Sequence, residues 1–422
     1  MNETIKHRIE QIKRGEVPTG YKKSKLGVLP GDWTSMTVGE CLEKVEKPVA
    51  VEPDKLYTQI GIRSHGKGLF YKEPVSGESL GNKSVFWVEP DCFVLNIVFA
   101  WEQAIGKTTE NEIGMIGSHR FPMFRPIDNR VYIDYLISYL LTKRGTDILE
   151  FASPGGAGRN RTLGQDRFLN SKIILPTIDE QKKIAEILAT QDKVIALKEK
   201  LLQEKKTQKK YLMQQLLTGE KRLPGFSGEW VRTKMSDVLE LRNEKNTSED
   251  LRICSVAVND GVVDQIAHLG KSMAASNTSN YAVVHYGDIV YTKSPTGNFP
   301  YGIVKQSQLA ENVAVSPLYG VYKPRTYELG FILNEYFSFA NNANNYLLPI
   351  INKGAKNTIN IADIIFLTPS LLLPKDDNEI CKLAQVFKKA NEEISIIQKS
   401  IGQEKQKKIA LMQLLLTGIV RV

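Results

Sequence analysis

The chain contains an internal duplication, and this repeat constrains its architecture more than any other feature of the sequence. Residues 183–188 and 211–219 recur 199 positions later, as residues 382–387 and 410–418, with the same pattern of apolar residues. A protein built from two similar halves suits a partner that also has two halves. For a basic chain, we interpret that partner as a DNA duplex with two half-sites.

The repeat divides the chain into two globular and two helical segments behind a short N-terminal arm. The predicted boundaries are 1–24 for the arm, 25–176 for the first globular domain, 177–222 for the first helical segment, 223–374 for the second globular domain and 375–422 for the second helical segment. Each globular segment begins near a tryptophan, Trp33 or Trp230, that follows a Leu-Pro-Gly turn. Each ends in an apolar run closed by a proline, Pro176 or Pro374.

Both globular segments are predicted to have mixed structure. Short runs rich in β-branched and aromatic residues, separated by Gly, Pro and Asn, predict strands. We expect strands at residues 57–62, 84–88, 93–99, 253–258, 282–285, 288–291 and 313–322. One helix is expected late in each segment, near residues 132–151 and 327–347. The fold class is therefore α+β, with two mixed α/β domains.

Both helical segments show a heptad pattern, in which apolar residues recur at alternating spacings of four and three. The predicted seam consists of Ile184, Leu188, Ile195, Leu202, Leu212, Leu216, Leu383, Phe387, Ile394, Ile397, Ile401, Leu411 and Leu415. Polar residues interrupt it at Gln191, Lys198, Lys205, Lys209, Glu404 and Lys408. We predict two long coiled-coil helices that separate the globular domains.

The direction of helix pairing follows from chain connectivity. A helix of roughly 40 residues is about 60 Å long. Antiparallel helices place one globular segment at each end and relate the halves by a pseudo-twofold axis. Parallel helices would require the second globular segment to bridge the whole helix length, so we expect the antiparallel arrangement.

The positive charge of the chain lies mainly in the arm and the helical segments. The net charge is +9, of which residues 1–24, 177–222 and 375–422 contribute +3, +4 and +3. The two globular segments contribute 0 and −1. DNA binding by the globular segments therefore depends on local clusters of cations, whereas lysine-rich helix faces in water explain the overall charge equally well.

Recognisable catalytic and metal motifs are not found in the sequence. The Gly-Lys-Thr and Gly-Lys-Ser triplets at residues 106–108 and 270–272 lack the earlier glycine of a phosphate-binding loop. The histidines form no zinc-ligand pattern, and residues 298–301 lack the first proline of an adenine-methyltransferase loop. Cys41, Cys92, Cys254 and Cys381 are widely spaced, which favours a reducing cytoplasm. We expect no catalytic residues, no metal and no membrane span in this chain.

Polar, glycine-containing loops are the candidate DNA contacts. At an offset of 197 residues, Arg159-Asn160 aligns with Lys356-Asn357. Arg and Lys can contact phosphate or guanine, and Asn can pair with adenine. The full set of predicted DNA-binding residues is Arg63, Lys67, Arg159, Asn160, Arg161, Lys293, Lys353, Lys356 and Asn357. Ordinary solvated loops with cationic residues explain the same sequences.

Five passages resemble the DNA-specificity subunits of type I restriction–modification systems, and the resemblance extends over essentially the whole chain. Residues 21–33 resemble the start of the first target-recognition domain of that family. Residues 175–188 resemble its central conserved helix, and residues 216–226 resemble the junction into the second recognition domain. Residues 60–68 and 287–295 look like segments within such recognition domains.

The resemblance implies a non-catalytic subunit that reads a bipartite DNA target with one half-site per recognition domain. It implies two modification subunits that carry S-adenosylmethionine and methylate adenine, and restriction subunits that use ATP and Mg to cut, as in defence against phage. Residues 374–379 depart from the Glu-Gln pattern that opens the first helix, and the first seam is the more polar. Both departures would make the docking of two modification subunits less symmetric.

A different class of function also fits the predicted architecture. A structural adaptor could use the same coiled coil to present two protein-binding domains. Salt dependence distinguishes the two hypotheses, because DNA binding through phosphates weakens steeply as salt rises.

Overall fold

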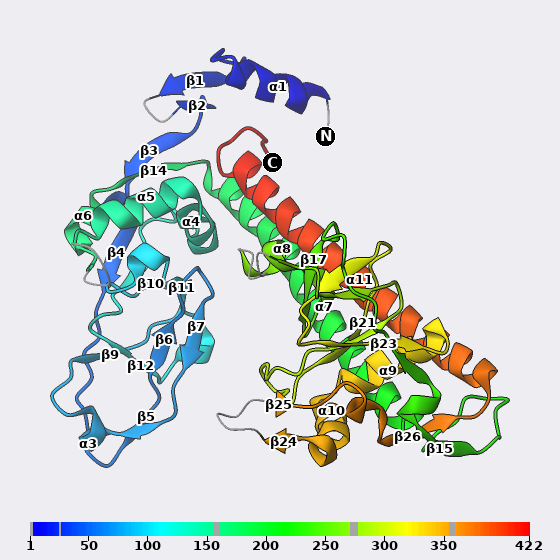
Figure 1. The fold of residues 1–422 in the computed structure, drawn as a ribbon. Coiled ribbons are helices and arrows are strands. Elements are labelled where there is room, and N and C mark those ends of the chain that lie inside the picture. Colours follow the sequence, from blue (N-terminus) through cyan, green and yellow to red (C-terminus); the bar gives the residue numbers. More distant parts are fainter. Residues whose placement is uncertain (1–2, 25–26, 156–160, 271–276, 354–358) are drawn as a thin grey trace. The chain divides into compact units, whose positions relative to one another are not determined.

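The chain folds into two compact units, each with one globular part and portions of both long helices. The computed structural model describes residues 3–24, 27–155, 161–270, 277–353 and 359–422. Unit 1 comprises Met1–Lys198 and Ser400–Val422, and unit 2 comprises Glu199–Lys399. Figure 1 shows mixed helices and strands in both globular parts, together with the two long helices.

The two long helices are α7 (Ile178–Leu216) and α11 (Asp377–Leu415), of 39 residues each. Both begin three or fewer residues after the proline that closes a globular segment, and both have acidic residues in the first turn. Acidic side chains at this position interact favourably with the helix dipole. In Figure 1, α7 is green and α11 is orange to red.

Within unit 1, α7 and α11 run in opposite directions. The Lys408 ammonium lies 2.6 Å from the Asp192 carboxylate, whereas Lys198 Nζ donates to Ser400 Oγ at 2.7 Å. Residue numbers therefore increase along α7 in the direction in which they decrease along α11. Within unit 2, Lys205 forms an ion pair of 2.8 Å with Glu393.

The globular part of unit 1 consists of short strands and short helices. Its elements are α1 (Glu3–Lys13), β1 (Tyr21–Ser24), β2 (Gly27–Pro30), β3 (Thr34–Thr37), α2 (Val38–Cys41), β4 (Leu42–Val45), β5 (Leu56–Tyr57), β6 (Ile60–Ile62), β7 (Leu69–Tyr71), β8 (Val75–Ser76), α3 (Gly77–Leu80), β9 (Val85–Trp87), β10 (Phe93–Leu95), η1 (Ala100–Glu102), β11 (Ile105–Lys107), η2 (Glu110–Glu112), β12 (Ile116–Ser118), β13 (Met123–Pro126), α4 (Ile133–Leu140), α5 (Lys143–Ala152), α6 (Gln165–Leu169) and β14 (Lys172–Leu175).

The globular part of unit 2 follows a similar sequence of elements. They are β15 (Trp230–Lys234), η3 (Met235–Asp237), β16 (Leu239–Leu241), β17 (Ile253–Ala257), β18 (Gly261–Asp264), α8 (Gln265–Leu269), β19 (Ala282–Val284), β20 (Ile289–Tyr291), β21 (Val304–Gln306), β22 (Val313–Val315), β23 (Gly320–Pro324), α9 (Tyr327–Phe337), α10 (Ala340–Leu347), η4 (Leu348–Ile350), β24 (Asn352–Lys353), β25 (Ile359–Asn360), η6 (Ile365–Leu367) and β26 (Ser370–Pro374).

The same strand order occurs in both units. An antiparallel sheet runs β11-β10-β13-β4 in unit 1 and β21-β20-β23-β16 in unit 2. In each globular part, the strand beside the tryptophan of the repeat pairs with the last strand: β3, after Trp33, with β14, and β15, from Trp230, with β26. Unit 2 has a further sheet, β18-β17-β22-β19, in which β17 and β22 are parallel. The duplication seen in the sequence is therefore a duplication of topology.

The helix predicted late in each globular segment is in fact two helices, so this expectation was wrong in detail. In unit 1 the break falls between α4 and α5, where the Thr142 hydroxyl caps α5 by accepting from Gly145 N at 3.2 Å. A Cβ at Gly145 would lie 2.2 Å from Leu140 Cα, so the tight connection requires glycine. In unit 2 the corresponding break separates α9 from α10.

Each globular part shares one hydrophobic core with the ends of the long helices that belong to its unit. In unit 1, Phe93, Phe124 and Phe168 are fully buried with Ile184 and Leu188 of α7. Leu415 and Leu416, at the end of α11, belong to the same core. Because this apolar surface is continuous, burial holds the globular part against the helices.

Unit 2 has the equivalent core and adds a buried ionic contact. Phe337, Phe366 and Phe387 pack together with Met213 and Leu216 of α7. Glu335 of α9 is 3% exposed, and its carboxylate lies 2.6 Å from Lys209 Nζ on α7. Asn391 of α11 donates to the other Glu335 oxygen at 2.9 Å. One α9 side chain thus contacts both long helices.

Candidate nucleic-acid interface

The loop between β6 and β7 in unit 1 carries two of the predicted DNA contacts, Arg63 and Lys67, and both side chains are exposed. The short helix η1 fixes this loop through its backbone. His65 N donates to Glu102 O at 2.8 Å, and Gly66 N donates to Gln103 O at 2.9 Å. The loop is therefore held in one conformation while its cations face solvent.

Arg63 is further oriented by its own hairpin. Its guanidinium carbon lies 5.1 Å from the centre of the Phe70 ring, and Nη1 donates to Leu69 O at 2.5 Å. Phe70 in turn covers Gly61, where a Cβ would lie 2.2 Å from the ring. A guanidinium that lies over an aromatic ring can still use the N–H groups in its own plane to bind a partner.

Arg161, a third predicted contact, lies near the same short helix. Its guanidinium carbon is 5.3 Å from the centre of the Trp101 ring, and Trp101 is a residue of η1. The structure thus brings Arg63, Lys67 and Arg161 to the surroundings of η1, although they are almost 100 residues apart in sequence. No sequence pattern singled out Trp101, and a lone tryptophan after an apolar run gives no functional signal.

Lys293 is the predicted DNA contact of unit 2 whose side chain the structure describes. It is not a free surface cation. Its side chain is 15% exposed, and Nζ forms an ion pair of 2.5 Å with Asp363. Its φ of 52° lies in the left-handed region, in the loop that follows β20. Asp363 is the residue that the duplication aligns with Asp166. The pair connects the loop after β20 to the segment that follows β25.

The remaining predicted DNA contacts cannot be placed. Arg159, Asn160, Lys356 and Asn357 lie outside the described residues. Lys353 is in β24, but its side chain is likewise outside the described part of the chain. The two loops that carry the duplicated cation–amide pairs therefore remain a prediction from sequence.

The structure shows a repeated ionic clasp that the sequence analysis missed. In unit 1, Arg421 donates to Glu180 through Nε at 2.6 Å and through Nη2 at 2.9 Å. It also makes two hydrogen bonds to Asp32, of 2.9 and 2.7 Å. Trp33 Nε1 donates to Glu180 at 3.2 Å. The hydrogen bonds that Arg421 donates lower the pKa of Asp32, and its hydrogen bonds to Glu180 and Asp32 raise the pKa of Arg421 itself.

Unit 2 contains the equivalent clasp, 199 residues away. Arg222 Nε donates to Glu379 at 2.7 Å, and Nη2 donates to the second oxygen at 2.5 Å. The Arg222 guanidinium carbon is 5.7 Å from the centre of the Trp230 ring, and the hydrogen bonds that Arg222 donates to Glu379 raise the pKa of Arg222. In each clasp, an arginine that follows one long helix binds a glutamate in the first turn of the other. The two arginines and the two glutamates are each separated by the offset of the repeat, and this was the sequence signal that could have revealed the clasps.

The polar residues of the predicted seam form a network within unit 1. Gln191 Nε2 donates to Glu404 Oε2 at 2.8 Å, and Lys198 Nζ lies 2.8 Å from Glu404 Oε1. These hydrogen bonds lower the pKa of Glu404, with the Lys198 contribution the larger. Of the predicted apolar seam residues, Ile184, Leu188, Ile195, Leu216, Leu383, Phe387, Ile401 and Leu415 are buried, and Leu202, Leu212, Ile394, Ile397 and Leu411 are half-buried.

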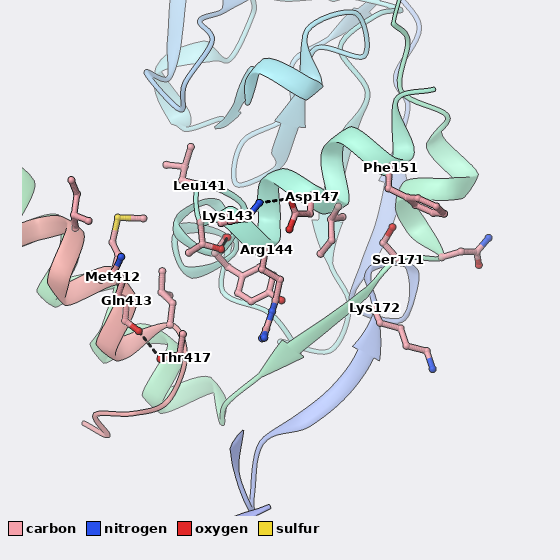
Figure 2. Close-up of a pocket in the computed structure, with 16 residues that line it drawn as sticks. Leu141, Lys143, Arg144, Asp147, Phe151, Ser171, Lys172, Met412, Gln413 and Thr417 are labelled. Atoms are coloured by element: carbon pink, nitrogen blue, oxygen red, sulfur yellow. Dashed lines mark hydrogen bonds and ion pairs between the residues drawn. The ribbon is translucent and has the colours of Figure 1, made fainter. Parts of the chain in front are cut away.

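A cavity of about 900 Å³ lies in unit 1 between α5 and the end of α11. Figure 2 shows Met412 and Gln413 of α11 on one side and Leu141, Lys143 and Asp147 on the other. Its walls are mainly apolar, and Lys143 pairs with Asp147 at 3.4 Å. The cavity contains none of the predicted DNA contacts.

None of the helices in the described ranges is long and apolar enough to cross a membrane. Within those same ranges, His, Cys, Asp and Glu side chains form no group that could hold a metal ion.

Comparison with known proteins shows which family this chain is similar to. Residues 85–206 match the family model described as the type I restriction modification DNA specificity domain. The matched residues run from β9 to the end of the globular part of unit 1 and include the first three quarters of α7.

Related proteins agree with this assignment. The chain is 25% identical over 213 residues to the putative type I restriction enzyme MjaX specificity subunit of Methanocaldococcus jannaschii. This match covers 47% of the chain and 48% of the relative, so the similarity extends over about half the length of each. The resemblance to type I specificity subunits predicted from the sequence is confirmed.

Two solved structures have the same fold over nearly the whole chain. The HsdS subunit of Thermoanaerobacter tengcongensis matches with a TM-score of 0.53 and 16% identity, over 93% of this chain and 98% of that one. The S subunit of the type I restriction–modification system of M. genitalium matches with a TM-score of 0.54 and 10% identity, over 91% and 96%. The mixed helix and strand fold is thus that of these subunits, and the comparisons do not favour the adaptor hypothesis.

Proposed function

We propose that this chain is the non-catalytic DNA-specificity subunit of a type I restriction–modification complex. Residues 25–176 and 223–374 are its two target-recognition domains, and each reads one half of a bipartite duplex target, largely from the major groove. Residues 177–222 and 375–422 pair as an antiparallel coiled coil with pseudo-twofold symmetry and set the distance between the half-sites. The N-terminal arm, residues 1–24, belongs to the first half.

The observation that carries this proposal is the duplicated topology. Each unit has a four-stranded sheet with the same strand order, a strand near its tryptophan that pairs with its last strand, and the same ionic clasp between arginine and glutamate at the ends of the long helices. Two equivalent scaffolds match a target with two half-sites, because repeated protein modules impose their spacing on the DNA that they read.

Exposed and stacked cations supply the chemistry of DNA contact. Arg63 and Lys67 are exposed, and Arg63 and Arg161 both stack on aromatic rings. In unit 2, Lys293 supports the loop through Asp363, and Lys353, Lys356 and Asn357 provide the contacts. Arg159 and Asn160 are the corresponding pair in unit 1. Cations of this kind contact phosphates for affinity and guanine for specificity.

The chemistry of the complex belongs to partner subunits. Two modification subunits bind the coiled coil, carry S-adenosylmethionine and methylate adenine. Restriction subunits use ATP and Mg to cleave. This chain carries no cofactor and takes no catalytic role, which agrees with the lack of any catalytic motif in its sequence.

The proposal is tested by selecting duplexes with the full chain from a randomised pool and then titrating the selected duplex at several salt concentrations. We expect one bipartite motif with a fixed spacer, and binding that falls steeply and log-linearly with salt. If no motif is selected and DNA binding does not change with salt, the proposal is contradicted and the adaptor hypothesis is favoured.

A further inference from the structure

The contact between Arg161 and Trp101 joins a predicted DNA-contact residue to one that no sequence pattern had indicated. The guanidinium carbon of Arg161 lies 5.3 Å from the centre of the Trp101 ring. Both side chains are half-buried. Among the described residues, Arg161 makes no hydrogen bond or ion pair, so the tryptophan ring is its defined partner.

Trp101 is itself fixed in place. Its indole Nε1 donates to Val98 O at 3.1 Å, which ties the ring to the turn that precedes η1. Gln103, the residue that caps η1, donates through Nε2 to the Thr146 hydroxyl of α5 at 2.6 Å. The ring that supports Arg161 is therefore anchored to the body of unit 1.

The same short helix also holds the loop that carries Arg63 and Lys67. Besides the backbone bonds from residues 65 and 66, Ser64 Oγ donates to the Glu102 carboxylate at 3.0 Å. One rigid element, η1, thus sets the positions of two cation-bearing segments from distant parts of the sequence.

A guanidinium stacked on a ring can use its N–H groups for in-plane hydrogen bonds. An arginine fork of this kind matches the O6 and N7 acceptors of guanine in the major groove. Stacking limits the rotation of the long side chain, so less conformational freedom is lost when the base is bound. A phosphate contact would also use the positive charge of the guanidinium but would not require the guanidinium plane to be fixed.

We infer that Trp101 is a positioning residue that presents Arg161 to a guanine in the half-site read by unit 1. The inference rests on the proposed DNA-binding function. It assigns base discrimination to Arg161 and assigns the orientation of Arg161 to Trp101, which does not touch DNA itself.

The test compares W101A, W101F and R161Q in the full chain, by selection from a duplex pool with two randomised half-sites. In R161Q, we expect one guanine position in one half-site to lose about tenfold or more of its preference. W101A is expected to lose several-fold at that same position, whereas W101F retains the preference because a phenyl ring still offers a face. The other half-site is the internal control for folding, and it should be unchanged in all three variants.

The possible outcomes separate the inference from the function on which it rests. If the wild-type chain selects no bipartite motif, the proposed function fails. If the wild type selects one and R161Q weakens binding equally for all sequences, Arg161 contacts phosphate and the inference is overturned. It is equally overturned if W101A keeps the full guanine preference, or if W101F loses as much as W101A.

Discussion

Arg421 binds Glu180 through two hydrogen bonds, of 2.6 and 2.9 Å, and so connects the segment after α11 to the first turn of α7. Glu180 is 4% exposed, whereas the Arg421 side chain is 35% exposed. A buried carboxylate depends on its cation, because burial without a partner is costly. Arg222 and Glu379 repeat this contact in unit 2.

We expect Arg421→Gln to lower the free energy of unfolding by about 2 kcal/mol, because it leaves the Glu180 carboxylate without its cation. The loss is smaller than for a fully buried charge, because solvent stabilises part of the unpaired carboxylate. The measurement is urea unfolding at neutral pH. Adding Glu180→Gln to Arg421→Gln should recover part of the loss, because the orphaned charge is removed. Lys200→Gln, at an exposed position of α7, is the control, with an expected change within about 0.5 kcal/mol. Additive losses from Arg421→Gln and Glu180→Gln would contradict the clasp.

The polar network of the seam gives a charge-exchange prediction. Lys198→Glu places a second carboxylate beside Glu404, and Glu404→Lys places a second ammonium beside Lys198, so each single variant should unfold at a lower urea concentration. The double variant should recover much of the loss because the pair is restored with reversed polarity. If the double variant is no more stable than the worse single variant, Lys198 and Glu404 do not interact in solution.

Removing a buried side chain of α11 should strongly destabilise the core of unit 2. Phe387 is fully buried, and Phe387→Ala is expected to lower the free energy of unfolding by about 3–5 kcal/mol. Ile396 lies on the same helix but is 65% exposed, so Ile396→Ala should change it by no more than about 0.5 kcal/mol. Equal effects of the two substitutions, in thermal or urea unfolding, would mean that this face of α11 is not packed as described.

Lys305 gives a pH prediction with a definite sign. Burial lowers the pKa of Lys305 below its ordinary value of 10.5, a change that nearby Lys209 reinforces and Glu335 opposes. Between the lowered pKa and 10.5 the unfolded chain binds more protons than the folded chain, so stability rises with pH through that window. Lys305→Met should remove this rise. The measurement is the wild-type stability minus the Lys305→Met stability, which should increase as the pH rises toward 10.5; a difference that falls as the pH rises would contradict the pKa direction.

The coiled-coil proposal predicts that helix length sets the spacer of the DNA target. Lys198 of α7 and Ser400 of α11 are hydrogen-bonded, so one heptad inserted after Lys198 and one before Ser400 lengthens both helices at the same level. Seven residues add about 10 Å, so the variant should select a longer spacer, by up to about three base pairs, with unchanged half-site sequences. A lengthened variant that keeps the original spacer would exclude the helices as a ruler.

Periodicity allowed the long helices to be predicted, because a heptad pattern depends only on residues close in sequence. The function of Gln191, Lys198 and Glu404 could not be predicted in this way. They were interpreted as polar interruptions, and the structure shows that they meet one another in unit 1. Which residues face each other across two helices depends on their register, which one helix alone does not determine.

The loops were the least predictable part of the candidate site. Arg63 and Lys67 lie exposed, as expected for contact residues, but Lys293 is only 15% exposed and forms an ion pair with a residue 70 positions later. The break at Thr142 was missed: threonine is a favoured N-cap residue, but no Glu or Gln follows three residues later to complete the usual capping pattern. Trp101 could not have been found, because its relation to Arg161 arises only from folding.

The most direct test of the central claim is sequencing of methylated adenines in cells that contain this protein and in otherwise identical cells that lack it. The account predicts methylation at one bipartite motif with a fixed spacer in the first cells and its complete loss in the second. The same pattern of methylated adenines in both would contradict the account.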